Sequence, residues 1–174
     1  MCKAADRAAS MTRMQPSPDE FALTDPRHPA LSVLPDVPTR EDIEAFGQFL
    51  QSLEPEHGVV DISTMHHHAE GLYGRSVVIR AGTFLVGLPH KAGHLNVCVG
   101  DITVWTEQGR RRLTGAHILS SPAGAIRVGF AHVDTTWLSV HRNDTGTTDS
   151  QALEETLVHH ADRLMSRRTQ EQLQ

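Results

Sequence analysis

Residues 82–100, GTFLVGLPHKAGHLNVCVG, alternate short apolar runs with turn residues and carry two histidines, His90 and His94. The chain continues as DITVWTEQG over residues 101–109, and a related pattern, GAHILSSPAGAIRVGFAH, follows over residues 115–132. β-Branched and aromatic residues favour strands, whereas Gly, Pro and Asp interrupt them. These stretches therefore predict short antiparallel strands joined by tight turns.

The same pattern extends over residues 59–143. Strands are expected at residues 77–79, 83–88, 95–99, 102–106, 117–120, 126–130 and 136–141. The pair Gly100-Asp101, between two apolar runs, is typical of a hairpin turn. Because no helical pattern separates these strands, the sequence predicts a sandwich or barrel rather than alternating βαβ units.

Helices are expected on both sides of the strands. Thr39 is a typical N-cap, and apolar residues at helical spacing predict a helix over 40–53 that ends before Pro55. Leucines at helical spacing predict a second helix over 149–170. The expected organisation is a proline-rich flexible arm (1–38), a helix with its connection (39–58), a β-barrel (59–143), and a linker with a C-terminal helix (144–174).

Composition excludes several classes of protein. The net charge of −5 argues against a nucleic-acid binder, which normally presents a basic face. Five Phe, two Trp and one Tyr in 174 residues disfavour a base-stacking surface. No apolar run is long enough to span a bilayer, and two cysteines cannot form a disulfide framework. A cytoplasmic protein without nucleic-acid or membrane partners is expected.

The turn pattern resembles the cupin superfamily of small jelly-roll barrels. Gly82, His90 and Gly100 match its first motif in order and spacing, and three residues match its second with one residue extra: Gly115, Pro122 and Gly124. The resemblance covers about residues 70–141, and the chain also resembles small cupin-like proteins of phages and prophages. It implies a mainly β, antiparallel jelly-roll barrel flanked by N- and C-terminal helices.

The chain departs from the family at its metal ligands. Ala92 stands where the second histidine of the first motif belongs, His94 stands near the acidic ligand's position, and Arg127 replaces the histidine of the second motif. His90 and His94 are therefore the first candidates for a metal site. A mixed histidine site suits a divalent transition ion, namely Fe, Mn, Ni or Zn.

A third ligand is needed, because most protein metal sites use at least three side chains. The candidates are one of the three consecutive histidines (His66, His67 and His68), with His67 preferred, or the strand residues His132 and His141. In a strand, neighbours alternate faces, so His67 and its two neighbours cannot all enter a barrel. A single histidine near a strand end is more often a hydrogen-bonded or surface residue.

Arg127 indicates a different kind of ligand. A guanidinium in the cavity would repel a divalent cation, but it can bind a carboxylate or phosphate in a bidentate manner. A small anionic ligand beside the metal, or in its place, is therefore expected.

Two classes of function remain open. The first, which is the preferred prediction, is a cupin-type barrel that binds a divalent metal, a small anionic ligand or both in its mouth, with no reaction assigned. The second is a non-catalytic jelly-roll for protein–protein interaction or assembly, which the departures from the ligand set favour. A homodimer is expected, with contacts from the strands and from residues 20–38, because two-fold pairs are the commonest closed assemblies.

Overall fold

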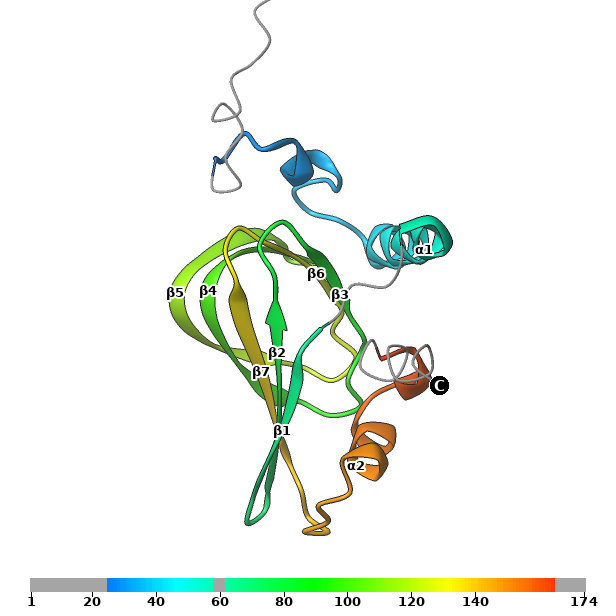
Figure 1. The fold of residues 1–174 in the computed structure, drawn as a ribbon, viewed down its shortest axis with the longest axis vertical. Coiled ribbons are helices and arrows are strands. Elements are labelled where there is room, and N and C mark those ends of the chain that lie inside the picture. Colours follow the sequence, from blue (N-terminus) through cyan, green and yellow to red (C-terminus); the bar gives the residue numbers. More distant parts are fainter. Residues whose placement is uncertain (1–24, 58–61, 165–174) are drawn as a thin grey trace, which may run out of the picture.

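A computed structural model describes residues 25–57 and 62–164, of which residues 54–57 are described by their backbone alone. The described residues form seven strands: β1 (Thr64–Ala69), β2 (Leu72–Ile79), β3 (Phe84–Gly87), β4 (His94–Thr106), β5 (Gly109–Ser121), β6 (Arg127–Ala131) and β7 (Thr135–Arg142). Two α-helices, α1 (Arg40–His57) and α2 (Ser150–Leu157), lie on the same side of the sheet (Figure 1). Short 3₁₀ turns are present at Pro29–Ser32 and Ala161–Arg163.

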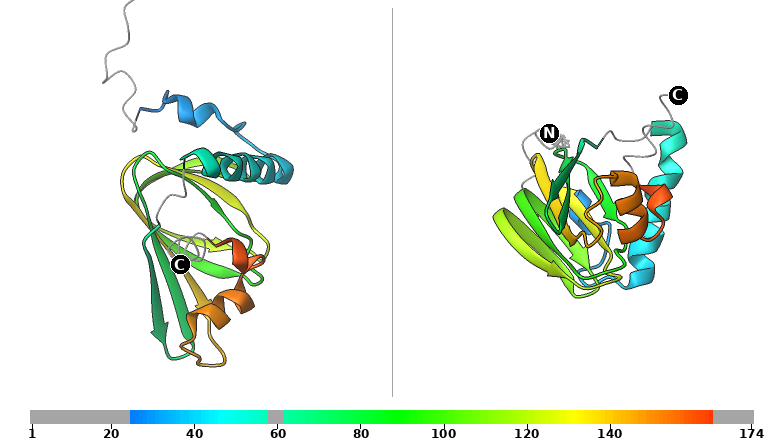
Figure 2. Two further views of the ribbon diagram at one scale, coloured as in Figure 1. Left: turned by 45° about the vertical axis from the view of Figure 1, so that its right-hand side comes forward. Right: turned by 90° about the horizontal axis from the view of Figure 1, so that it is seen from below.

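All the strand pairs are antiparallel, and β4 organises them. Its first half, Leu95–Val99, pairs with β7, and its second half, Ile102–Trp105, pairs with β6, while its other edge pairs with β5 throughout. The path β1-β2-β7-β4-β6-β3 therefore curls around a common interior, as the two views of Figure 2 show. This confirms the expected mainly β, antiparallel barrel with flanking helices.

The Gly100-Asp101 hairpin expected from the sequence is wrong, because β4 runs through both residues. Gly100 pairs with Gly115 of β5 and bends the strand at a φ of +146°. A Cβ at Gly100 would lie 2.4 Å from the Thr135 side-chain oxygen, so glycine is required here by close approach as well as by backbone conformation. The observed hairpin lies later, at the turn between Thr106 and Gly109.

Both helices differ in length from the sequence prediction. Helix α1 extends beyond the predicted end at residue 53, through Pro55 to His57. Helix α2 ends at Leu157, where Val158 takes an extended conformation and pairs with His90. Residues 165–170 of the expected helix lie outside the described part of the chain. No helix within the described residues is long and apolar enough to cross a membrane.

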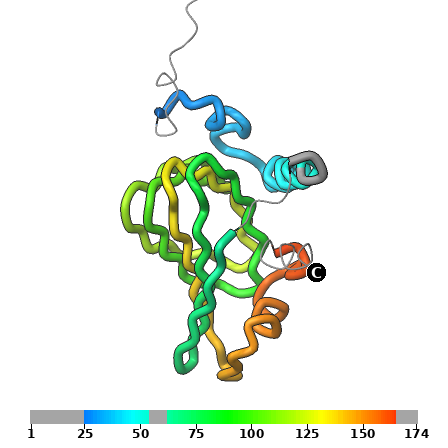
Figure 3. The backbone as a smooth tube through the Cα atoms, in the orientation of Figure 1, coloured from blue at the N-terminus to red at the C-terminus, as the bar shows by residue number. Residues whose placement is uncertain are grey.

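The described part of the N-terminal arm packs on the barrel of its own chain. Leu31 and Leu34 are buried with α1 residues Ile43 and Phe46 and with Trp105 of β4. Arg110 of β5 donates to the carbonyl of Leu31 and pairs with Asp36. Residues 25–38 therefore close one end of the barrel, next to α1, as the backbone trace shows (Figure 3).

Candidate metal and ligand site

Three histidines from separate segments converge at the end of the barrel near α2. Nitrogen atoms of His90, His94 and His141 all lie within 4.8 Å of one another. The ring centroids of His90 and His94 are 4.1 Å apart, and those of His94 and His141 are 4.6 Å apart. His90 Nδ1 and His141 Nε2 lie at hydrogen-bond distance, 2.8 Å.

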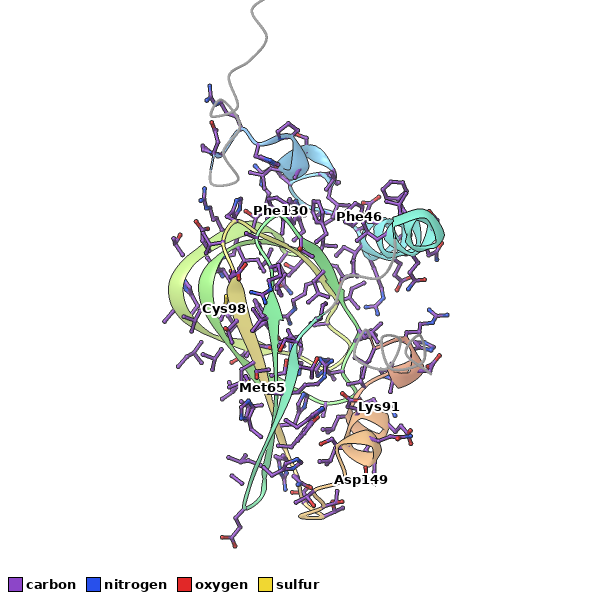
Figure 4. The ribbon with its side chains drawn as sticks, viewed as in Figure 1. Phe46, Met65, Lys91, Cys98, Phe130 and Asp149 are labelled. Atoms are coloured by element: carbon purple, nitrogen blue, oxygen red, sulfur yellow. The ribbon has the colours of Figure 1, made fainter. Side chains whose placement is uncertain are left out.

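The β3–β4 connection holds His90 in place. His90 pairs with Val158 just after α2, and the amide of Lys91 donates to the carbonyl of Leu157. The carbonyl of His90 also accepts from the amide of Gly124. Lys91 accordingly lies beside α2 in Figure 4. These backbone bonds connect a ligand candidate to two distant segments, so its position depends on the tertiary fold.

Strand register brings His94 next to His141. Leu95 of β4 pairs with Val140 of β7, and in an antiparallel ladder the next pair along is His94 with His141. Along the same face, Asn96 pairs with Ser139 and Cys98 with Trp137. The inward face of β4 and β7 therefore begins with the two histidines. The polar pair Asn96 and Ser139 follows, and then the less polar pair Cys98 and Trp137.

All three imidazoles are neutral near pH 7. Burial lowers the pKa of His90 to about 2, with additional lowering from the charges of His94 and His141. Burial lowers the pKa of His141 to about 4 and lowers the pKa of His94 as well. A neutral imidazole has one nitrogen lone pair, which is the form that binds a metal.

The geometry fits a transition ion with small adjustments. Imidazole nitrogens bind zinc at about 2.0–2.1 Å, which places tetrahedral ligands roughly 3.4 Å apart. The three nitrogens, within 4.8 Å, reach this spacing if the rings rotate by a modest amount. Nδ1 of His94 donates to the carbonyl of Ala92 at 3.2 Å, which leaves the lone pair of the neutral ring on Nε2.

Arg127 enters the same cavity and is held by a polar network. Its guanidinium donates to the hydroxyl of Ser121 and lies 5.2 Å from the ring centroid of Trp137. Asn96, which is almost fully buried, donates to the same Ser121 oxygen at 2.7 Å and accepts from Trp137 Nε1 at 2.9 Å. Burial lowers the pKa of Arg127, and no carboxylate among the described residues pairs with it.

The cavity beside these residues has a volume of about 840 Å³. Its polar lining includes His90, His94 and Arg127, and Ile43 and Leu50 of α1 contribute to its apolar lining. His141 lines a smaller adjoining cavity of about 40 Å³ next to Tyr73 and Glu154. Glu154 pairs with Arg75 at 2.9 Å. The volume of the main cavity is typical of small-molecule sites, about 300–1,000 Å³.

Two other histidines expected as ligands are placed elsewhere. His67 pairs with Gly74, the neighbour of Tyr73, whereas His141 pairs with Tyr73 itself. Because neighbouring strand residues alternate faces, His67 points to the outer face, where its Nε2 lies 2.9 Å from the Ser76 hydroxyl.

His132 is buried at the bend of β4, away from the cluster. Its amide donates to the carbonyl of Asp101, and its Nε2 lies 2.7 Å from the hydroxyl of Thr103. Of the open candidates for a third ligand, the structure therefore brings only His141 to the pair His90 and His94. His66 and His68 lie against Tyr73 instead.

Cys98 is fully buried, opposite Trp137 in the pairing of β4 with β7, and it is labelled in Figure 4. Burial raises the pKa of its thiol to about 11. It is therefore an inert core residue rather than a nucleophile.

No protein-family model matches the chain, and no curated protein sequence is significantly similar to it. A cupin superfamily protein from Desulfitobacterium hafniense is 13% identical, with a TM-score of 0.41 over 48% of this chain and 79% of that one.

Two further structures are a cupin 2 conserved barrel domain protein from Leptotrichia buccalis and a cupin domain from Bordetella pertussis. The first is 9% identical with a TM-score of 0.42, over 48% of this chain and 41% of that one. The second is 13% identical with a TM-score of 0.38, over 47% and 93%. All three of these proteins are named as cupins, the family that the turn pattern resembles.

Proposed function

We propose that the protein binds a divalent transition metal together with a small anionic ligand in the cavity of its barrel. The observation that carries the proposal is the convergence of His90, His94 and His141, which come from a loop and two strands, within 4.8 Å. Three imidazoles without a carboxylate form a nitrogen donor set, which suits Zn, Ni or Fe(II) better than the oxygen-seeking Mg, Ca or Mn.

Each residue has a distinct role in this proposal. The three histidines would hold the ion, and the ion would act as a Lewis acid on a bound oxygen. Arg127 supplies the anion site, because its guanidinium faces the cavity without a carboxylate partner among the described residues. Arg75, the neighbouring cation, is already paired with Glu154. The buried free thiol of Cys98 fits a reducing compartment, so we place this binding in the cytoplasm.

Metal content tests the proposal directly. The full chain is incubated with Zn, Ni, Fe(II) or Mn, passed over a desalting column and analysed for elements. We expect about one ion per chain in the wild type, and a large loss of bound metal in His141→Ala. His67→Ala is the matched control, since it removes a histidine from the same sheet but from its outer face. Wild-type protein without stoichiometric metal, or equal retention in both variants, contradicts the metal site.

The outer face of the sheet favours a second candidate function, assembly with another copy of this chain. Leu95 and Val99 of β4 and Ile118 of β5 are 48%, 50% and 74% exposed. Among the described strands, β5 pairs only with β4, so its other edge is available for pairing. A homodimer through this face is compatible with ligand binding, because Leu95, Val99 and Ile118 do not line the cavity.

A further inference from the structure

The cavity has a polar end and an apolar end. Near His94, the inward side chains of β4 and β7 are Asn96 and Ser139, which hydrogen-bond to each other at 2.8 Å. Farther along β4, the side chains that line the cavity are Ile102 and Val104. The wall therefore changes from hydrogen-bonding to hydrocarbon along a single strand.

The apolar end is incompletely filled by the protein. Leu85 of β3 and Trp137 of β7 pack against the core cluster that contains Ile102 and Val104, yet both remain only partly buried. Both side chains also line the 840 Å³ cavity. Open apolar surface inside a barrel is costly in water and becomes favourable when hydrocarbon covers it.

Arg127 lies where the two ends meet. Its guanidinium has five N–H donors, of which the described residues engage only the one directed at Ser121. Trp137 contacts this cation with its ring and also forms part of the apolar wall. A ligand that satisfies Arg127 therefore extends naturally onto Trp137 and Leu85.

We infer that the ligand of this cavity is an amphiphilic monocarboxylate, whose carboxylate pairs with Arg127 and whose hydrocarbon part lies against Leu85, Trp137 and Val104. This rests on the proposed anion site and specifies its ligand class. A small inorganic anion would occupy only a minor part of 840 Å³ and would leave the apolar walls in contact with water. A neutral hydrocarbon would leave the charge of the half-buried guanidinium without an anionic partner.

A chain-length series tests the ligand class. Binding of butyrate, hexanoate, octanoate and decanoate to the full chain is measured by calorimetry, with and without added zinc. We expect the affinity to rise by up to about fourfold for each added methylene, as for complete burial of hydrocarbon. The alkanols of the same lengths should bind more weakly, and Arg127→Met should remove the preference for the carboxylate over the alkanol.

Two matched variants test where the hydrocarbon lies. Leu85→Trp fills the apolar end and should lower the affinity for decanoate at least tenfold while leaving butyrate within about twofold. Leu95→Trp, on the exposed outer face of β4, should change neither affinity. Circular dichroism and thermal melting of both variants establish that they are folded, and a misfolded Leu85→Trp is replaced by Val104→Phe.

The outcomes separate this inference from the proposed function. Butyrate and decanoate binding with equal affinity through Arg127 would overturn the amphiphilic ligand but keep the anion site. No carboxylate binding at any length, with or without zinc, would overturn both. If the wild type binds carboxylates but elemental analysis finds no bound metal, the metal site is contradicted. The dependence of affinity on chain length would still support the amphiphilic ligand.

Discussion

Nδ1 of His90 and Nε2 of His141 lie 2.8 Å apart, although the two residues are 51 positions apart in the sequence. Since both rings are neutral, one nitrogen donates and the other accepts, so the pair shares one proton. An ion bound by these two nitrogens must replace that proton. The hydrogen bond therefore keeps two ligand candidates close together before any metal arrives.

This arrangement predicts a metal-dependent gain in thermal stability. An ion at 100 times its Kd stabilises the folded protein by about 2.7 kcal/mol, which for a chain of this size raises Tm by roughly 5–10 °C. We expect this rise for the wild type with added zinc or nickel, followed by differential scanning fluorimetry, and no rise for His94→Ala. His117→Ala, which changes a half-buried histidine of β5 that bonds to the carbonyl of Thr114, should respond as the wild type does. A response retained in His94→Ala would contradict the site.

The sequence predicts part of this site, for physical reasons that can be identified. His90 and His94 are separated by a short turn, so local sequence is enough to bring them together. The third member depends on the register between β4 and β7, in which Leu95 meets Val140. That pairing is long-range, and local periodicity does not distinguish His141 from His132 or His67.

Long-range strand pairing also explains why the hairpin predicted at Gly100-Asp101 is wrong. Glycine and aspartate between apolar runs favour a turn, and the strands on either side were correctly expected. However, β4 gains hydrogen bonds from β5 along its whole length, and a second glycine, Gly115, stands opposite the bend. Long-range pairing therefore overrides the local turn preference and converts a hairpin signal into a bent strand.

The bend predicts a marked difference between two glycine substitutions. Gly100→Ala places a Cβ 2.4 Å from a side-chain atom of Thr135, which is fully buried, at a φ that alanine disfavours. We expect a cost of about 2–4 kcal/mol in the free energy of unfolding. At Gly115 an added Cβ would make no contact within 4 Å, so Gly115→Ala should lower the free energy of unfolding by only about 1 kcal/mol, because of the positive φ. Urea denaturation measures both, and equal costs would rule out the close approach as the main reason for Gly100.

The ion pair at this bend predicts a dependence of stability on pH. Arg112 donates two hydrogen bonds to the carboxylate of Asp101, at 2.8 and 2.7 Å. These bonds hold the pKa of Asp101 below its ordinary value of 3.8. A carboxyl group with a lowered pKa in the folded state stabilises the protein above its unfolded pKa, and this contribution is lost as the pH falls through its folded pKa.

The variant Asp101→Asn tests this contribution of the ion pair to the free energy of unfolding. At pH 7 the variant should be less stable by about 1 kcal/mol, a modest value because the pair is partly exposed. The difference from the wild type should persist down to about pH 5 and shrink below pH 3.8 as Asp101 becomes protonated. Urea titrations at several pH values measure this, and a difference that stays constant into acid would exclude the ion pair as its cause.

The exposed apolar outer face of the sheet predicts that a homodimer forms through this face. It also indicates which substitution should disrupt the dimer. Val97 of β4 pairs with Ile118 of β5 and Leu138 of β7, so three apolar side chains form one row across the outer face. Ile118 is the most exposed of them, at 74%. Contiguous exposed apolar surface is typical of an interaction site, and a two-fold pair uses the same face twice.

Ile118→Glu should therefore convert the dimer into a monomer, because each two-fold interface would contain two added charges. Light scattering of the full chain measures the mass, and circular dichroism follows the fold, which this outward-facing position should leave unchanged. Val133→Glu is the matched control, an exposed valine that lies outside these three strands in the β6–β7 turn, and it should remain dimeric. Shortening the arm is a poorer test, since Leu31 and Leu34 are buried against the barrel of their own chain. A monomeric wild type, or an Ile118→Glu variant that stays dimeric, would contradict an interface on this face.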